Sequence, residues 1–252
     1  MKKNIVKLRI SDLIFIVIIV FLIGFLFGLG SIPKEIKKTS EFKQQNINET
    51  IIEIGIPAVD SKGNGVVGKL ETIVRPGTGL VLVNINNVLA QYDTQYSGRV
   101  AAKVASEYTK TNMSNLDVIY NIKVNASIVE GPSAGASMAL SIILALENKK
   151  SNPNVMITGT INEDGTIGPV GAIYEKALAA KNANATIFLV PQDQSTQYGY
   201  KRERECKKFD FIEYCSIKYI AEKINIGESL NITVKEVRNI DDAVKYFIQN
   251  SI

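Results

Sequence analysis

The chain has 252 residues, 46 % of them hydrophobic, and a formal net charge of +4, and this length suffices for one domain with a well-buried core. Because the first 12 residues hold four basic residues and one acidic residue, residues 31–252 carry 25 basic and 24 acidic side chains, which leaves no basic footprint for a nucleic-acid partner. The chain has no histidine and only two cysteines, which excludes Ser-His-Asp and Cys-His catalysis, imidazole-ligated zinc and four-thiolate zinc, so we expect neither a metal nor a cofactor.

Residues 1–12 form a basic N-terminal segment, and residues 13–30 contain no charged and no polar side chain. As a helix, residues 13–30 would extend about 27 Å, close to the ~30 Å hydrocarbon thickness of a bilayer. A transmembrane helix, or uncleaved signal anchor, is therefore expected. A cleaved signal peptide remains the alternative, because Gly28 and Gly30 are small residues at suitable −3 and −1 positions.

The charges around this span favour an N-terminus in the cytoplasm. Four basic residues precede the span, although Lys34, Lys37 and Lys38 follow it, so the positive-inside bias is weak. The expectation is a single-pass protein of the cell membrane with the bulk of the chain outside the cytoplasm. Residues 31–49 are polar and without a sustained period, which is typical of a linker.

From residue 50 onward, hydrophobic periodicity and turn residues predict alternating strands and helices. The expected strands are 50–60, 66–76, 79–86, 117–125, 154–161, 186–191 and 230–237, and the expected helices are 88–110, 133–149, 172–184 and 240–249. A charged and aromatic stretch, 194–228, is left without assignment. Residues 50–252 are thus predicted to form one domain of the α+β class.

The stretch "GNGVVGKL", residues 63–70, is close to a phosphate-binding Gly-x-x-x-x-Gly-Lys loop. Leu70 stands where that loop requires Ser or Thr, and the following residues continue as a strand instead of a helix. Nucleotide binding is therefore not expected here.

Ser133 lies in a Gly-x-Ser-x-Gly frame, Gly131 to Gly135, directly before a buried helix. This frame presents the nucleophile of many hydrolases, but short Gly/Ser turns also serve simply as helix N-caps. Without histidine, a nucleophilic Ser133 needs another base, and a lysine with a lowered pKa is the remaining option.

Lys176 is the lysine whose surroundings suit that role. Its neighbours three and four positions away on the helix are Ala172, Ile173, Ala179 and Ala180, so it projects from an apolar face. Burial there would favour the neutral amine. The alternative is a structural lysine whose amine reaches the solvent.

Three stretches, "EGPSAGASMAL", "MITGTINEDGTIGPVGAIYEKALAA" and "ATIFLVPQD", occur in this order and together resemble the proteolytic domain of the Lon proteases. The first carries the nucleophile signature of that family and the second its lysine segment. Ser133 falls on the family's nucleophile and Lys176 on its general base. The resemblance covers about residues 57–193.

The resemblance implies a Lon proteolytic domain-like fold, of the ribosomal protein S5 domain 2-like superfamily. It further implies a serine endopeptidase with a Ser133–Lys176 dyad, in which Thr158 positions the lysine amine and Gly131 and Pro132 belong to the loop that supplies oxyanion donors. Peptides or unfolded proteins would be its substrates, and a homo-oligomeric ring, a hexamer, its assembly.

The strand "SNLDVIYNIKV" is similar to that of archaeal members, so an archaeal-type, membrane-anchored member is expected. No ATPase domain precedes the resembling part, and an ATP-independent activity is therefore expected. Thr160, Ala172 and Tyr96 depart from residues common in the family, which bears on specificity more than on the dyad.

An alternative function is a non-catalytic or anion-binding module on the same fold that acts as a scaffold of a membrane assembly. Cys206 and Cys215 lie in the unassigned stretch 194–228. In an exported domain they would form a disulfide. Otherwise they would be two unpaired thiols.

Overall fold

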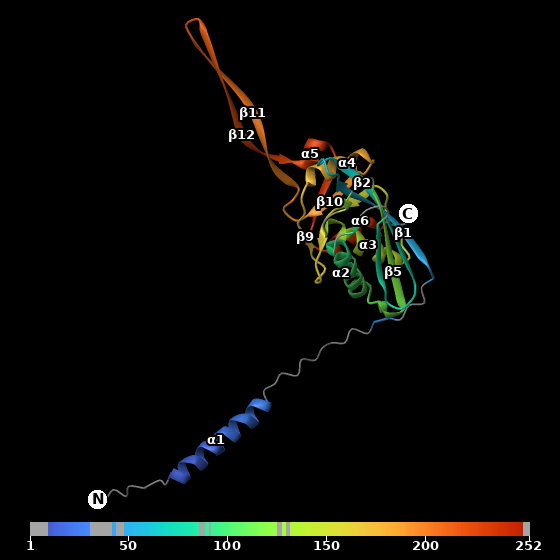
Figure 1. Cartoon of the computed structure of the whole chain (residues 1–252), viewed down its shortest axis with the longest axis vertical. Coiled ribbons are helices and arrows are strands. Elements are labelled where there is room, and N and C mark those ends of the chain that lie inside the picture. The colour runs from blue at the N-terminus through green and yellow to red at the C-terminus, as the bar shows by residue number, and fades with distance from the viewer. Residues whose placement is uncertain are drawn as a thin grey trace, which may run out of the picture. The chain divides into compact units, whose positions relative to one another are not determined.

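Figure 1 shows a computed structural model of the chain, which describes residues 10–30, 42–43, 48–85, 89–90, 92–124, 128–129 and 132–248. The chain divides into two units, Met1–Ser40 and Glu41–Ile252.

Helix α1 (Ile10–Gly30) is the described element of the first unit and covers the stretch that the sequence predicts to span a membrane. Among the described residues, no helix combines the length and apolar character needed to cross a membrane. The membrane span stays a prediction.

The second unit is built on a four-stranded sheet of order β1-β2-β5-β3. Neighbours β1–β2 and β2–β5 are antiparallel, and β3 runs parallel to β5. The strands are β1 (Thr50–Val59), β2 (Gly65–Pro76), β5 (Leu116–Lys123) and β3 (Val81–Ile85). Strand β5 alternates buried and partly buried residues, as expected of a strand with one face on a core.

Two helices cover opposite faces of β1 and β2. Helix α3 (Gly135–Leu146), all of whose residues are buried, packs between these strands and α2 (Tyr92–Thr109). Helix α4 (Ile173–Asn182) packs on the other face of the same strands. Gly65 permits this approach, because a Cβ there would collide with the carbonyl of Glu175. The glycine-rich stretch 63–70 thus serves strand–helix packing.

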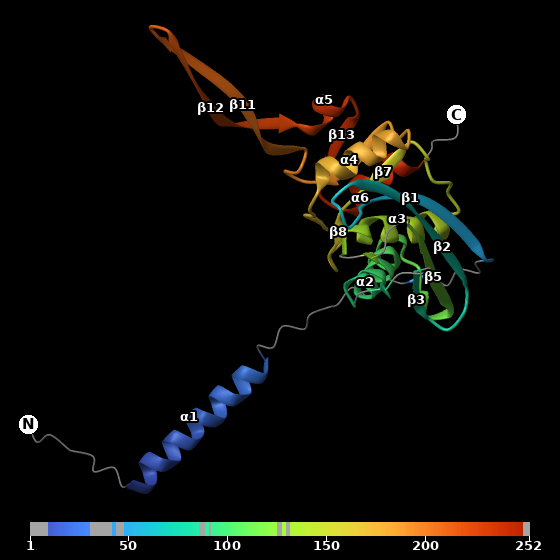
Figure 2. The same ribbon diagram turned by 45° about the horizontal axis from the view of Figure 1, so that its top comes forward.

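A second sheet, of order β13-β10-β7, is entirely parallel and lies beside α6 (Ile240–Phe247) (Figure 2). Its strands are β13 (Thr233–Val237), β10 (Ile187–Pro191) and β7 (Val155–Ile157). The unit therefore has a mixed α/β architecture.

Two expected elements are wrong in part. The helix expected over 88–110 begins at Tyr92, because β4 (Leu89–Ala90) pairs in parallel with β6 (Ile128–Val129). The strand expected over 154–161 is split into β7 and β8 (Thr160–Ile161), and β8 pairs with β9 (Ile167–Gly168). The backbone leaves the sheet at Thr158 and Gly159, where it bonds to the Ser133 segment.

The unassigned stretch forms a long hairpin, β11 (Thr196–Phe209) and β12 (Ile212–Asn225), followed by α5 (Ile226–Leu230). The strands are in register over their whole length. Figures 1 and 2 show the hairpin extending away from the body of the domain. We call it the arm.

Candidate active site

Ser133 lies at the start of α3, in a single 3-10 turn, Pro132–Ala134. Pro132 is exposed and Ser133 partly exposed, whereas the helix that follows is buried. A Cβ at Gly135 would lie 2.8 Å from Ile161 Cγ2 and 2.9 Å from the Ile161 backbone nitrogen. Glycine at this position therefore lets the turn that carries Ser133 sit directly against β8. Gly131, the first residue of the frame, lies outside the described residues.

Backbone hydrogen bonds fix the Ser133 turn to the corner between β7 and β8. The Gly159 N–H donates to the Ser133 carbonyl at 3.0 Å, and the Ala136 N–H donates to the Gly159 carbonyl at 3.1 Å. The Thr158 hydroxyl donates to the same Ser133 carbonyl at 3.4 Å. These bonds hold the 3-10 turn so that the Ser133 carbonyl points toward the β7–β8 corner.

Lys176 lies on α4 and is buried, with 4 % of its surface exposed. Its Nζ donates to the Thr158 hydroxyl oxygen at 3.4 Å. None of the salt bridges between described residues includes Lys176. Burial lowers the pKa of its amine to about 8, because a charged amine loses hydration inside the protein.

Thr158 is the residue that connects the two predicted site residues. It is 1 % exposed and its backbone N–H donates to Leu189 of β10, so its position is fixed by the second sheet. Its hydroxyl donates to the backbone carbonyl of Ser133 and accepts from the Lys176 amine. These two bonds use the donor and one of the two acceptor positions of the hydroxyl. A neutral amine that donates one N–H to Thr158 keeps its lone pair for a proton.

The start of α4 is held by contacts that the sequence did not indicate. The Gln194 side chain accepts from the Val170 N–H at 3.0 Å and donates to the Val170 carbonyl at 2.8 Å. Ala172, two residues further, has the left-handed conformation, φ 56°. The sequence gives little indication of this contact, because nothing in the pattern of residues 194–228 shows which backbone groups the Gln194 amide binds. Gln194 therefore fixes the turn that precedes the lysine helix.

The departures Thr160 and Tyr96 lie at the edge of the same region. The Lys103 Nζ donates to Glu163 Oε2 at 2.5 Å, and the Tyr96 hydroxyl donates to Glu163 Oε1 at 3.5 Å. Thr160 pairs with Gly168 in the short β8–β9 ribbon. Tyr96 thus helps connect α2 to the turn between these strands.

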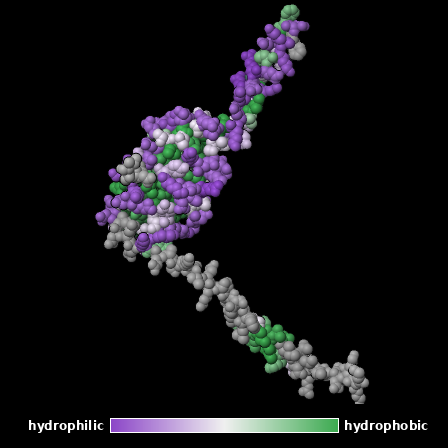
Figure 3. Space-filling model, turned by 180° about the vertical axis from the view of Figure 1, so that it is seen from behind, coloured by the Kyte–Doolittle hydropathy of each residue, from purple (hydrophilic) through white to green (hydrophobic). Residues whose placement is uncertain are grey.

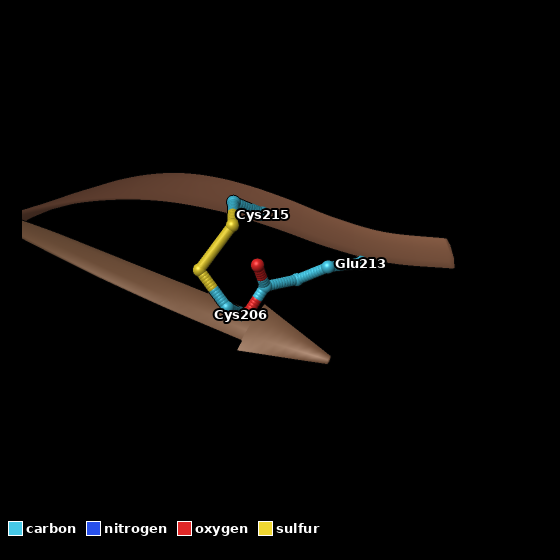
Figure 4. A group of neighbouring side chains, drawn as sticks. All are labelled: Cys206, Glu213 and Cys215. Atoms are coloured by element: carbon cyan, nitrogen blue, oxygen red, sulfur yellow. A yellow bond between two sulfur atoms is a disulfide. The ribbon is translucent and has the colours of Figure 1, made fainter. Parts of the chain in front are cut away.

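Cys206, Glu213 and Cys215 form a cluster of potential metal ligands on the arm (Figure 4). The two cysteines are paired across β11 and β12 and joined by a disulfide. Thiolates are the form in which cysteine binds metal, so this cluster offers one carboxylate and no thiolate.

Comparison with known proteins gives a family for this arrangement. The Lon protease (S16) C-terminal proteolytic domain matches residues 65–222. The Lon protease of Clostridioides difficile is 26 % identical over 189 residues, which covers 75 % of this chain and 22 % of that protein. The Lon protease of Flavobacterium johnsoniae is 24 % identical over 237 residues, covering 82 % of this chain and 27 % of that protein.

The Lon protease of Dictyoglomus thermophilum is 30 % identical over 148 residues, covering 55 % of this chain and 18 % of that protein. The chain thus spans about a fifth to a quarter of the length of these relatives. The family match includes the Ser133 turn, the Thr158 corner and the Lys176 helix. The chain therefore belongs to the family of Lon proteolytic domains, serine peptidases that use a Ser-Lys dyad.

Proposed function

We propose that the protein hydrolyses peptide bonds with Ser133 as nucleophile and Lys176 as general base. The observation that carries this proposal is the buried amine of Lys176, which forms no salt bridge with any described residue. It donates to the Thr158 hydroxyl, which in turn donates to the backbone carbonyl of Ser133. With a pKa of about 8, roughly a tenth of the amine is neutral at pH 7. An ordinary surface lysine, with a pKa near 10.4, would be almost entirely charged there.

In the proposed reaction, the Ser133 hydroxyl adds to the peptide carbonyl carbon while its proton moves to the Lys176 amine. The resulting ammonium returns that proton to the leaving amine as the peptide bond breaks, which leaves an acyl group on Ser133. Water then adds to the ester carbonyl, giving its proton to Lys176, and the serine alkoxide leaves with that proton. Each cycle returns both residues to their starting state.

The N-terminus of α3 supports the negative charge that develops on the substrate oxygen. Ser133 precedes this helix by two residues, and helix N-termini carry a partial positive charge and unpaired backbone N–H groups. Pro132 has no N–H to contribute, so it is not itself a donor.

We further propose that the protein is membrane-anchored, faces away from the cytoplasm and acts without ATP on peptides or unfolded proteins, as a homo-oligomer. The uncharged stretch 13–30 supports the anchor. The disulfide supports export, because such bonds persist in oxidising compartments. Retention in the membrane fraction after carbonate extraction is the expected result, and release into the supernatant contradicts the anchor.

The catalytic proposal is tested by hydrolysis of casein and of a quenched fluorescent peptide by the full chain, without nucleotide. Ser133→Ala and Lys176→Arg are each expected to abolish hydrolysis, because arginine keeps its charge and cannot accept the proton. Lys181→Arg is the matched control, since Lys181 lies on the same helix but is exposed. Hydrolysis by Lys176→Arg at the rate of Lys181→Arg would remove the lysine from the mechanism.

A further inference from the structure

The arm has two faces that differ in how their charges are satisfied. In an antiparallel hairpin, directly paired residues point to the same face and successive residues alternate. The register of the arm pairs Arg202 with Tyr219, Arg204 with Ile217 and Cys206 with Cys215. These pairs, two residues apart, therefore share one face.

We call this face, which contains the disulfide, the arginine–tyrosine face. It is made of Tyr198, Tyr200, Arg202, Arg204, Cys206, Lys208, Glu213, Cys215, Ile217, Tyr219, Ala221 and Lys223. Its three tyrosines are 68 to 78 % exposed. It carries four basic residues against one acidic residue, and its basic side chains take part in none of the salt bridges between described residues. The face thus presents aromatic surface and an excess of positive charge.

On the opposite face, acidic and basic side chains form salt bridges with one another. Lys201 pairs with Glu203 at 3.5 Å, and Glu205 pairs with Lys218 at 2.5 Å and with Lys207 at 3.8 Å. All three ion pairs of the arm lie on this face. On the arginine–tyrosine face, by contrast, Arg202 and Arg204 form no salt bridge with any described residue.

A hollow of about 570 Å³ lies on the body of the domain, between the ends of α2 and α3 and the start of α6. Its floor contains the buried residues Val104, Gly165 and Ile240, and four exposed carboxylates surround it: Glu107, Glu147, Asp164 and Asp241. One basic residue, Lys110, also lines it.

Tyr108 also lines this acid-rimmed hollow, and the pKa of its phenol reflects the negative charge there. The pKa of its phenol is raised by burial and by the nearby charges of Glu147 and Asp241. An occupant that places an aromatic or branched side chain on the floor and cations at the rim would complement both parts of the hollow.

We propose that the arginine–tyrosine face of one chain docks into the acid-rimmed hollow of a second copy. The arm supplies tyrosine and isoleucine side chains for the apolar floor and arginine and lysine side chains for the carboxylate rim. A 14-residue strand extends about 46 Å at roughly 3.3 Å per residue, and the arm points away from its own body (Figures 1 and 2). The hollow that it meets therefore belongs to a neighbouring copy.

This contact is head-to-tail, since the arm and the hollow are different surfaces. Repetition of such a contact builds a ring when the rotation between copies closes. The disulfide fits this role, because a free two-stranded hairpin is marginally stable, and closing the loop between Cys206 and Cys215 adds about 2–3 kcal/mol. A fixed register keeps the basic and aromatic side chains on one face.

A lipid surface is the other partner that cationic and aromatic side chains could meet. The distribution of charge argues against it. Phe211 at the turn is fully exposed, but the residues around it, 205–213, hold three acidic and two basic side chains, a balance that an anionic leaflet does not attract. Figure 3 shows the arm mostly hydrophilic, with scattered apolar positions. Acidic and basic side chains alternate along the whole arm, which suits a protein partner better than an anionic lipid surface.

The test measures assembly, so it is independent of peptidase activity. We expect the full chain, solubilised in mild detergent at micromolar concentration, to sediment as an oligomer whose size falls with added salt. The double variant Arg202→Glu, Arg204→Glu is expected to raise the dissociation constant by about tenfold or more. Lys201→Glu, Lys207→Glu, on the opposite face, is the matched control and is expected to assemble as the unchanged chain does.

A charge swap completes the test. Glu107→Lys, Glu147→Lys is expected to dissociate alone and to assemble when mixed with Arg202→Glu, Arg204→Glu. Both glutamates lie at helix C-terminal ends, where lysine is favourable, so folding should be retained. A monomeric full chain, an oligomer insensitive to both double variants, or failure of the mixture to assemble would overturn the proposal. So would binding to phosphatidylserine vesicles that is lost in the Arg202→Glu, Arg204→Glu variant while assembly is retained.

Discussion

Replacing Lys176 with methionine removes the buried amine but keeps a side chain of similar length. The protonated amine is disfavoured in the folded state, because its pKa falls from 10.5 to about 8 by burial. Since each pKa unit corresponds to about 1.4 kcal/mol, the charged form costs the folded state about 3 kcal/mol. Loss of the 3.4 Å hydrogen bond to Thr158 offsets about 1 kcal/mol of the gain. We therefore expect Lys176→Met to raise the free energy of unfolding by about 2 kcal/mol near pH 6.

The sign of the pH dependence follows from the lowered pKa. Below about pH 8 the amine is charged in both the folded and the unfolded state, and the folded protein carries the whole cost of burying that charge. Between about pH 8 and pH 10.5 the amine is protonated only in the unfolded chain. The wild type therefore becomes more stable as the pH rises through this range. The penalty falls to about 1 kcal/mol near pH 10. The advantage of Lys176→Met should therefore disappear at high pH.

Urea unfolding of the full chain, followed by tyrosine fluorescence near pH 6 and near pH 10, measures this difference. Lys181→Met, on the exposed side of the same helix, is the control and should change stability little at either pH. A 2 kcal/mol gain corresponds to a rise in Tm of about 4–8 °C. Equal stability of Lys176→Met and wild type near pH 6, or a difference that does not change with pH, would refute the claim that Lys176 is held against its preferred charge state.

Three further substitutions test how the site is built. Ala172→Gly should raise the free energy of unfolding by up to about 1 kcal/mol, because alanine at φ 56° is strained; thermal unfolding measures it, and a loss of stability would contradict the argument. Gly135→Ala should lower the free energy of unfolding by about 1–3 kcal/mol and remove most of the peptidase activity, because the new methyl group meets Ile161. Gly171→Ala, which has nothing within 4 Å of its new methyl group, should change stability little. Equal effects of the two substitutions on urea unfolding and peptide hydrolysis would refute the packing account. Gln194→Ala should lose about 1–2 kcal/mol and lower kcat by freeing the Val170 backbone, while exposed Gln192→Ala serves as the neutral control.

The sequence predicts the secondary structure best where burial is periodic. Strand β5 alternates between buried and partly buried residues. Helix α3 is a long, mostly apolar run, and both elements were predicted close to their observed bounds. The split of residues 154–161 at Thr158 was not predicted, because it depends on a hydrogen bond to the distant Ser133 carbonyl. Local periodicity contains no information about such a partner.

The arm was not predicted, for a different reason. Both of its faces are solvent-exposed over most of their length and both contain charged and apolar residues, so no alternation of burial indicates a strand. Of the candidate site residues, Ser133 and Lys176 were predicted from motif and apolar surroundings. The Gln194 contact with Val170 joins residues 24 positions apart and required the structure.

The most direct test of the Ser133–Lys176 proposal is the pH dependence of Ser133 acylation by a peptidyl fluorophosphonate, followed by mass spectrometry of the labelled peptide. If Lys176 accepts the serine proton, the labelling rate of the full chain should rise with pH along a single titration with an apparent pKa of about 8. Lys181→Arg should give the same curve, and Lys176→Arg should leave Ser133 unlabelled across the range. Labelling of Ser133 in Lys176→Arg at the wild-type rate, or a wild-type rate that does not change between pH 6 and 10, would contradict the account.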